Sequence, residues 1–316
     1  MVFLWIGLGL LALLLGGLLV SAYYSYRVAF YNKKPEFYDP ENLDIPAGPV
    51  YEPHREQMLA WMKETTAIPH TSVSITSYDG LKLWGDFFEC APGAPIELMF
   101  HGYRGSSRRD LCGGVQRCFA VGRSALIVDQ RSCGRSEGKT ITFGVKERKD
   151  CLRWIDFILE NYGRDRKIIL TGVSMGAATV LMATAEKLPP NVVGVIADCP
   201  YSSQRDIMKL VIGRMGLPPK LAYPITRLGA LLFGHFRLEE LAPEQAMKTC
   251  KIPVFFVHGE ADDFVPMEMS KTNYEACAAR KHLLLVPGAG HCLGYLQDPQ
   301  RYIKELNEFF APELNT

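Results

Sequence analysis

A serine bracketed by glycines is the residue of this chain best placed to do chemistry. Residues 172–176 read Gly-Val-Ser-Met-Gly, follow an apolar run at 168–170 and open a stretch of helical character. A sharp strand-to-helix turn in this context exposes the serine hydroxyl above a sheet, and a helix N-terminus favours developing negative charge. Ser174 is therefore the candidate nucleophile, and the Met175 N–H is a candidate oxyanion donor. The alternative is a glycine-rich turn that binds nothing.

A serine hydroxyl attacks a carbonyl readily only when a base accepts its proton. His291 ends the segment Gly-Ala-Gly-His at 288–291, which follows the last expected strand. This is the carboxyl edge of a parallel sheet, where active sites form. The other six histidines lie before the core, at strand ends or in an insertion and are weaker candidates. The alternative for His291 is an ordinary surface-loop histidine.

The base needs a carboxylate that fixes its tautomer. Asp262 lies in the loop 258–266 after the preceding strand and is the first choice. Its neighbour Asp263 and Asp198, at the end of an earlier strand, remain alternatives. A second oxyanion donor is expected in the loop 100–105, where Gly102 lets the backbone turn and the Tyr103 N–H points inward.

Short apolar runs alternate with longer helical segments from about residue 72 onward. Continuous apolar runs are typical of strands buried on both faces, so the pattern predicts an α/β fold with a mostly parallel, doubly wound sheet. The expected strands are 73–77, 81–88, 96–100, 125–129, 167–171, 192–198, 252–257 and 282–286. The expected helices are 108–121, 144–162, 175–187, 267–279 and 298–311.

The first 26 residues contain no charged residue and no histidine. At a rise of ~1.5 Å per residue, a helix over 2–24 would be ~35 Å long, enough to span a bilayer. We therefore expect a single transmembrane anchor at 1–26, a linker and lead-in at 27–70, and a catalytic domain at 71–312. A cleaved signal peptide is the alternative, because Val20-Ser21-Ala22 resembles a cleavage site, although the apolar run exceeds the usual ~7–15 residues.

The charge balance and the cysteine content indicate which partners and which cellular location to expect. Lys plus Arg number 35 against 34 Asp plus Glu, for a formal charge of +1, which argues against a nucleic-acid partner. Arg27, Lys33 and Lys34 follow the span and favour a single-pass protein with a cytoplasm-facing catalytic domain. Nine cysteines without a CxxC pair fit a reducing compartment and give no support for a zinc site. An outward-facing domain with unpaired thiols is the alternative. Neither metal nor cofactor is expected.

Residues 201–245 separate two expected strands by more than one helix requires, and long insertions of this kind are often lids. Helical pieces are expected at about 204–215 and 220–233. The segment 204–238 holds six basic residues and one acidic one, among many apolar residues. One hypothesis is a lid that touches the membrane interface or accepts amphiphilic, anionic acyl substrates. The alternative is an ordinary solvated helix pair covering the site.

Taken together, these motifs resemble the serine α/β-hydrolase superfamily over residues 70–312. The resemblance rests on the His-Gly loop at 101, the Gly-x-Ser-x-Gly motif at 172, the aspartate loop at 258 and the Gly-x-Gly-His segment at 288, in that order. The segment 129–138 is similar to a structural loop of the family, with Ser132 where many members carry glycine. The anchor plus a single hydrolase domain resembles membrane-anchored bacterial esterases and peptidases.

The resemblance implies acyl transfer through an acyl-enzyme, with Ser174, His291 and Asp262 as nucleophile, base and orienting acid. The expected function is a serine hydrolase of carboxylic esters, similar to esterases and lipases, acting on a small-molecule acyl substrate. A peptidase or amidase acting on small peptides is the alternative, because the same triad cleaves amides. A non-catalytic membrane protein that keeps the fold for binding is the second alternative.

Overall fold

The computed structural model describes residues 1–33, 44–46 and 48–314. An eight-stranded sheet has the order β1-β2-β4-β3-β5-β6-β7-β8, and all pairs are parallel except β1 with β2 and β2 with β4. The strands are β1 Thr71–Thr76, β2 Lys82–Phe88, β3 Ile96–Phe100, β4 Ser124–Val128, β5 Ile168–Val173, β6 Val192–Asp198, β7 Val254–Gly259 and β8 Lys281–Val286. The expected mostly parallel α/β fold is confirmed, and every expected strand is present.

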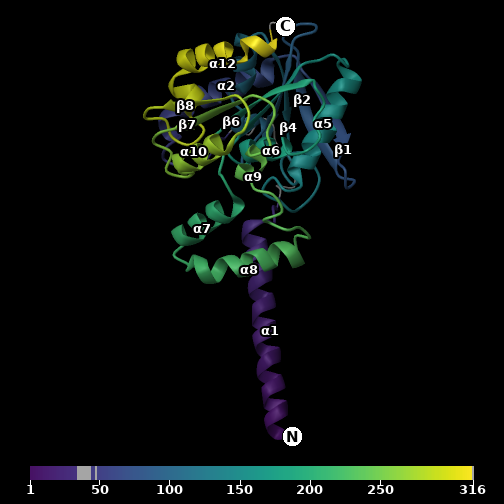
Figure 1. Cartoon of the computed structure of the whole chain (residues 1–316), viewed down its shortest axis with the longest axis vertical. Helices are drawn as coiled ribbons and strands as arrows, with labels where there is room; N and C mark the ends of the chain where they lie inside the picture. Colours follow the sequence, from purple (N-terminus) through teal and green to yellow (C-terminus); the bar gives the residue numbers. More distant parts are fainter. Residues whose placement is uncertain (34–43, 47, 315–316) are drawn as a thin grey trace.

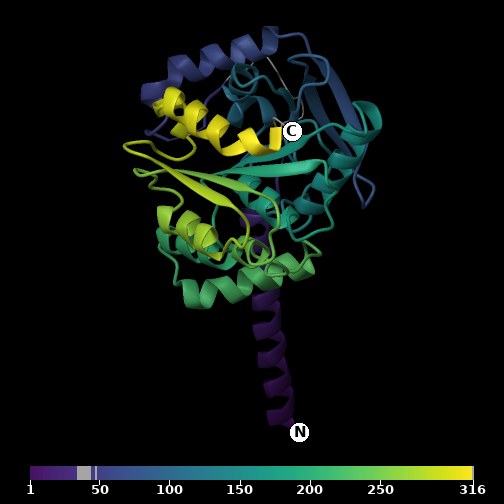
Figure 2. The ribbon, with the colours of Figure 1, turned by 45° about the horizontal axis from the view of Figure 1, so that its top comes forward.

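Helices cover both faces of the sheet, as Figures 1 and 2 show. One face packs against α5 Glu147–Asn161, α6 Met175–Ala183, α9 Pro243–Met247 and α10 Met267–Ala276. The other carries α2 Arg55–Ala67, α4 Gly114–Ala120, α11 Gly294–Gln297 and α12 Pro299–Leu314. Strands β3, β4 and β7 are buried along their whole length because they lie between these two helical layers.

Two regions differ from the sequence prediction. The helix expected over 108–121 is divided into α3 Ser107–Asp110 and α4, because two glycines at 113–114 weaken helix propensity between them. The expected linker and lead-in at 27–70 contains a short 3₁₀ helix, η1 Glu52–His54, and α2, whose Met58, Met62 and Thr65 are buried at helical spacing. Residues 34–43 and 47 of that segment lie outside the described residues.

The N-terminal helix α1 runs over Val2–Ala29, three residues beyond the expected anchor. Its hydropathy of 2.5 and its length are sufficient to cross a membrane, and a signal sequence near the N-terminus meets the same criteria. Figure 1 shows α1 projecting from the domain, with the lid helices α7 Gln204–Arg214 and α8 Pro219–Leu232 around its domain end. The two expected lid helices are thus present, and α8 packs against α1 at Ala22 and Tyr26.

Candidate active site

Ser174 occupies a strained turn between β5 and α6. Its φ is 53° and its ψ is −117°, values that a non-glycine residue rarely adopts. The Ser174 N–H donates to the Asp198 carbonyl at 2.8 Å, which ties the turn to the next strand. Gly176 is required for the close packing of α6, because a Cβ there would lie 2.1 Å from the Phe100 carbonyl oxygen. The elbow thus holds the serine at the carboxyl edge of the sheet.

Asp262 and His291 meet at the same edge because β7 and β8 are parallel neighbours. His291 Nδ1 lies 2.6 Å from Asp262 Oδ2. The other oxygen, Oδ1, accepts the N–H groups of Phe264 at 2.9 Å and Val265 at 2.8 Å. The carboxylate is therefore fixed by its own loop, and its second oxygen is presented to the imidazole.

The pair favours its charged state. Burial alone raises the pKa of Asp262, but hydrogen bonds from His258 and His291 hold that pKa well below its usual range. Burial alone lowers the pKa of His291, but the hydrogen bond and charge of Asp262 raise it above its ordinary value. Burial raises the pKa of the Cys199 thiol, so that neighbour of His291 stays neutral. The aspartate is ionised at neutral pH and stabilises an imidazolium.

The other two aspartates are placed differently. Asp263 is exposed, and its backbone carbonyl accepts a hydrogen bond from Arg214 of the lid. Asp198 is buried, and its Oδ1 has no hydrogen-bond partner among the described residues. Burial raises the pKa of Asp198. The structure therefore brings Asp262, and neither alternative, into hydrogen-bond contact with His291.

Ser174 and His291 line one cavity of about 470 Å³. Both side chains are mostly buried, with 8% and 7% exposed. In the described part of the chain, no hydrogen bond joins the Ser174 hydroxyl to the imidazole, and such contacts often tighten only when substrate binds. The nucleophile and base candidates thus share a cavity in which a substrate carbonyl can reach both.

The expected oxyanion loop lies beside the serine. A Cβ on Gly102 would be 3.6 Å from Ser174 Cβ. Within the described chain, no hydrogen bond uses the N–H of Tyr103 or of Met175, so both donors remain open to a ligand. The Tyr103 hydroxyl donates to the Ala29 carbonyl at 2.9 Å, which connects this loop to α1.

Sequence reasoning missed two residues that position the site. Asp110 Oδ2 accepts the Gly102 N–H at 3.1 Å and so supports the oxyanion loop. His258 is fully buried, donates through Nε2 to the Val265 carbonyl at 2.9 Å, and lies 3.2 Å from Asp262 Oδ2. His258 was visible as a histidine at a strand end, but Asp110 carries no sequence signal because its partner is a backbone N–H. His101 is buried in the core and accepts the Gln130 N–H through Nε2.

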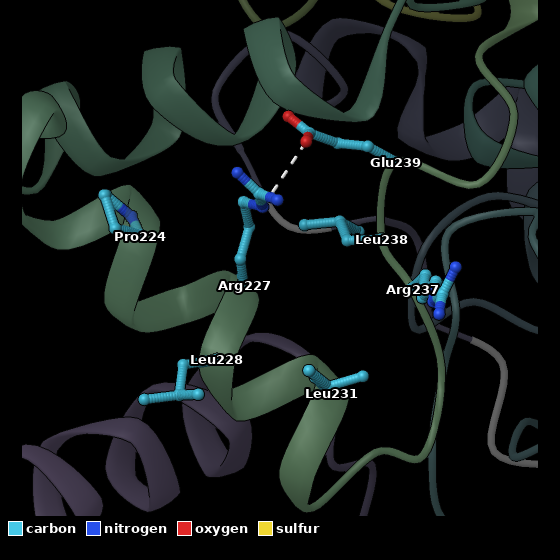
Figure 3. A pocket seen from close by; sticks show the side chains of 7 residues that line it. All are labelled: Pro224, Arg227, Leu228, Leu231, Arg237, Leu238 and Glu239. Carbon is cyan, nitrogen blue, oxygen red and sulfur yellow. Dashed lines mark ion pairs between the residues drawn. The ribbon is translucent and has the colours of Figure 1, made fainter.

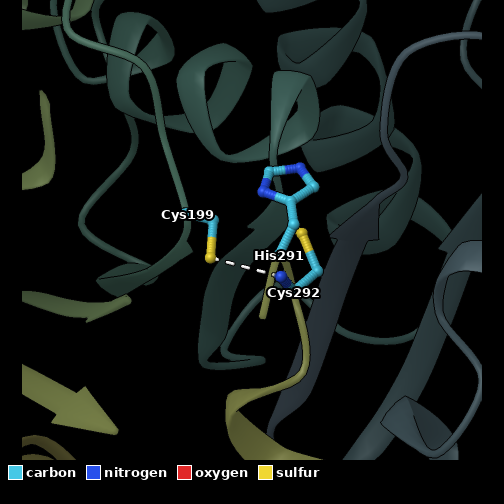
Figure 4. A group of neighbouring side chains, drawn as sticks. All are labelled: Cys199, His291 and Cys292. Carbon is cyan, nitrogen blue, oxygen red and sulfur yellow. Dashed lines mark hydrogen bonds between the residues drawn. The ribbon is translucent and has the colours of Figure 1, made fainter. Parts of the chain in front are cut away.

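Two cysteines flank His291, as Figure 4 shows. The Cys292 N–H donates to Cys199 Sγ at 3.3 Å. The two thiols and the imidazole have ligand atoms within 4.8 Å of one another, and a second group of this kind joins Cys199 to His258 and Asp262. A soft metal ion bound in either group would engage His291 or Asp262, which the triad itself requires. These donor sets therefore do not support a resident metal that works alongside the triad.

The charge of the lid is smaller than the count over 204–238 indicates. Glu239, one residue beyond that window, pairs with Arg205 at 2.7 Å and with Arg227 at 3.3 Å, the second pair being visible in Figure 3. Arg214 donates to the backbone carbonyls of Asp263 and Phe264. Three of the six basic side chains thus form hydrogen bonds or ion pairs within the protein, which weakens the expectation that they recognise an anionic substrate.

The geometry predicts how activity depends on pH. Only the neutral imidazole accepts a proton, and Asp262 raises the pKa of His291, so kcat/KM for a short ester should rise with pH to a midpoint above about 6.5. Asp262→Asn removes the charge that stabilises imidazolium, so the midpoint for residual labelling by a fluorophosphonate should fall. Asp263→Asn is the matched control and should leave the midpoint unchanged. A midpoint that stays fixed in Asp262→Asn would contradict the assignment.

Comparison with known proteins places this chain in a family. Residues 98–305, more than half of the chain, match the family model described as "Alpha/beta hydrolase family". The uncharacterized protein YqkD of Bacillus subtilis is 30% identical over 191 residues, covering 60% of this chain and 62% of that protein. The chain thus spans less than two thirds of the length of that relative.

Solved structures share the architecture at low sequence identity. The esterase Pf2001 of Pyrococcus furiosus superposes with a TM-score of 0.63 at 22% identity, covering 87% of this chain and 99% of that one. The acylaminoacyl peptidase of Pyrococcus horikoshii gives 0.56 at 17% identity, covering 78% of this chain and 41% of that one. At these identities the likeness concerns the fold alone.

Proposed function

We propose that this chain, which belongs to the alpha/beta hydrolase family, is a serine hydrolase that cleaves carboxylic esters through an acyl-enzyme. The single observation that carries the proposal is the 2.6 Å contact of Asp262 with His291, in the cavity that also holds Ser174 on its strained turn. This arrangement supports the assignment of Ser174 as nucleophile, His291 as base and Asp262 as orienting acid. Two open backbone donors beside the serine suit a developing oxyanion.

The proposed reaction has two steps, acylation of Ser174 and hydrolysis of the acyl-enzyme. Ser174 Oγ forms a bond to the ester carbonyl carbon while His291 accepts the hydroxyl proton, and the tetrahedral oxyanion lies against the N–H groups of Tyr103 and Met175. The bond to the leaving alkoxide then breaks as His291 returns the proton to it. Water repeats the sequence on the acyl-enzyme and releases a carboxylic acid. Asp262 stays ionised and stabilises the imidazolium.

We favour esters over peptides as the substrates because of the cavities around Ser174. A second cavity of about 320 Å³ beside the serine is lined mostly by apolar side chains of α1 and the lid, which suits an acyl chain. A peptidase acting on small peptides is the second candidate, and the fold of the acylaminoacyl peptidase named above is compatible with it.

We further propose that α1 is retained as a single membrane span. Ala22, the last residue of the cleavage-like segment, is fully buried against α8, so the end of that segment packs against the lid. Arg27 and Lys33 after the span favour a cytoplasm-facing domain.

Labelling with a fluorophosphonate tests the function. The purified full-length protein should be labelled at Ser174, and Ser174→Ala should abolish labelling while Ser74→Ala, an edge-strand serine remote from the site, should leave it intact. Enzyme that has not been treated with the label is then assayed on acetate esters and on acyl-dipeptides. A well-folded wild type that resists labelling would overturn the proposal, and a preference for the peptides would favour the peptidase.

A further inference from the structure

The apolar cavity beside Ser174 is bounded by the N-terminal helix itself. Its lining includes Tyr24, Ser25, Val28 and Ala29 of α1 together with Ser174 and Met175. Helices α7 and α8 complete it with apolar side chains such as Ile212 of α7 and Ala222 of α8. A helix of the kind that crosses membranes therefore forms one wall of a cavity that reaches the candidate nucleophile.

The domain end of α1 is fixed in place rather than loosely tethered. A Cβ on Gly229 of α8 would lie 2.4 Å from the Ala22 carbonyl oxygen, so the two helices touch through their backbones. The Tyr26 hydroxyl shares a 2.8 Å hydrogen bond with Thr140. Arg104, within the oxyanion loop, donates to the carbonyls of Val28 at 2.7 Å and Tyr31 at 3.0 Å. These contacts hold the wall in register with the catalytic loops.

The position of α1 sets the depth of the cavity relative to a bilayer. The uninterrupted exposed stretch of the helix, residues 2–21, is ~30 Å long at ~1.5 Å per residue, which equals the thickness of the hydrocarbon core. Helix α8 contacts the next turn, at Ala22 and Tyr26, and therefore lies at the interface. The apolar side chains that the lid exposes at this level are Met215, Leu217, Leu221, Leu231 and Leu232.

The cavity opens on this same side. Six residues of its lining are exposed. Arg104 and Phe264 belong to the loops beside Ser174, and the other four are Tyr24 at 70%, Val28 at 37%, Met215 at 56% and Leu217 at 48%. These four belong to α1 and to the turn between α7 and α8, so most of the exposed lining lies between the span and the lid. An exposed apolar rim at interfacial depth is suited to acyl chains rather than to water.

A different environment lies on the other side of the serine. The 470 Å³ cavity that contains His291 is lined also by Arg104, Arg109 and Asp110. The two cavities share Tyr103, Arg104, Ser174 and Phe264 in their linings. Ser174 therefore lies where an apolar cavity meets one that also presents charged side chains, an arrangement that suits an ester with an acyl chain and a polar leaving group.

We propose that the apolar cavity is an acyl-chain site that opens to the bilayer, with α1 as one wall, and that the substrate class is a long-chain acyl ester held in the membrane. The chain enters between α1 and the α7–α8 turn, its ester carbonyl reaches Ser174, and its polar leaving group occupies the His291 cavity. This inference rests on the proposed serine hydrolase function and on the proposed span.

The test compares two serines one helical turn apart on α1. Ser25→Trp places a bulky ring in the cavity, whereas Ser21→Trp makes the same change at an exposed position outside the lining. The full-length protein is assayed in phosphatidylcholine vesicles against p-nitrophenyl palmitate and p-nitrophenyl acetate. Ser25→Trp should lower kcat/KM for the palmitate at least about tenfold, while acetate hydrolysis and fluorophosphonate labelling stay within about twofold of wild type. Ser21→Trp should match wild type on both esters.

A second variant covers the case in which Ser25→Trp fails to fold. Val211→Trp fills the cavity from the lid and should give the same selective loss. Equal loss on both esters in a variant that keeps normal labelling, or no loss on the palmitate in both variants, would overturn the acyl site. Failure of wild type to label would instead overturn the proposed function, so the two failures are distinguishable.

Discussion

Ser174→Ala and His291→Ala are each expected to lower kcat for a short ester at least about 10⁴-fold, the largest effect anticipated for this protein. Without the hydroxyl no acyl-enzyme forms, and without the imidazole the hydroxyl has no base. Both side chains are nearly buried in one cavity, so neither loss can be replaced by a neighbouring group in the same geometry. Steady-state kinetics on p-nitrophenyl acetate measures the effect.

The double variant provides the sharper part of this prediction. Residues that act as one catalytic unit lose activity non-additively, so Ser174→Ala combined with His291→Ala should be no worse than either alone. Thermal unfolding serves as the control for folding, and Ser74→Ala should retain full activity. Independent, multiplicative losses would show that the two residues do not act on the same step.

Local sequence patterns predict the strands and the strand-to-helix turn because these elements depend on residues that are close together in the sequence. Apolar runs placed all eight strands, and the Gly-x-Ser-x-Gly segment placed Ser174 between a strand and a helix. The meeting of Asp262 with His291 follows from the adjacency of β7 and β8, because parallel strands bring their carboxyl ends to the same edge. Chain order and spacing were therefore sufficient to bring these residues to one edge, and the structure supplies the distance.

Contacts between segments that are far apart in the sequence leave no comparable pattern in it. Asp110 supports Gly102 through a backbone N–H, which any residue except proline would offer. Glu239 pairs with both Arg205 and Arg227 across the lid and lies just outside the counted window, so the count overestimated the net charge. The role of α1 as a cavity wall depends on its docking to α8 through Gly229, and the apolar sequence of the span predicts only its length.

Asp262→Asn is expected to reduce kcat by about 10⁴-fold while leaving the loop intact. The asparagine Oδ1 can still accept the N–H groups of Phe264 and Val265, but its amide replaces the oxygen that lies 2.6 Å from His291 Nδ1. An amide donor there stabilises the tautomer with a proton on Nε2, which cannot accept the proton of Ser174. The same amide faces the His258 Nε2–H, so the unfolding temperature should fall as well.

The other two aspartates are matched controls for this prediction. Asp263→Asn changes an exposed neighbour and should leave kcat within about twofold, as surface substitutions usually do. Asp198→Asn keeps the buried volume at a position that makes no hydrogen bond to His291 among the described residues, so its effect should be far smaller than that of Asp262→Asn. Because His291 can take only one orienting carboxylate on Nδ1, a large loss in Asp198→Asn with none in Asp262→Asn would transfer the acid role to Asp198.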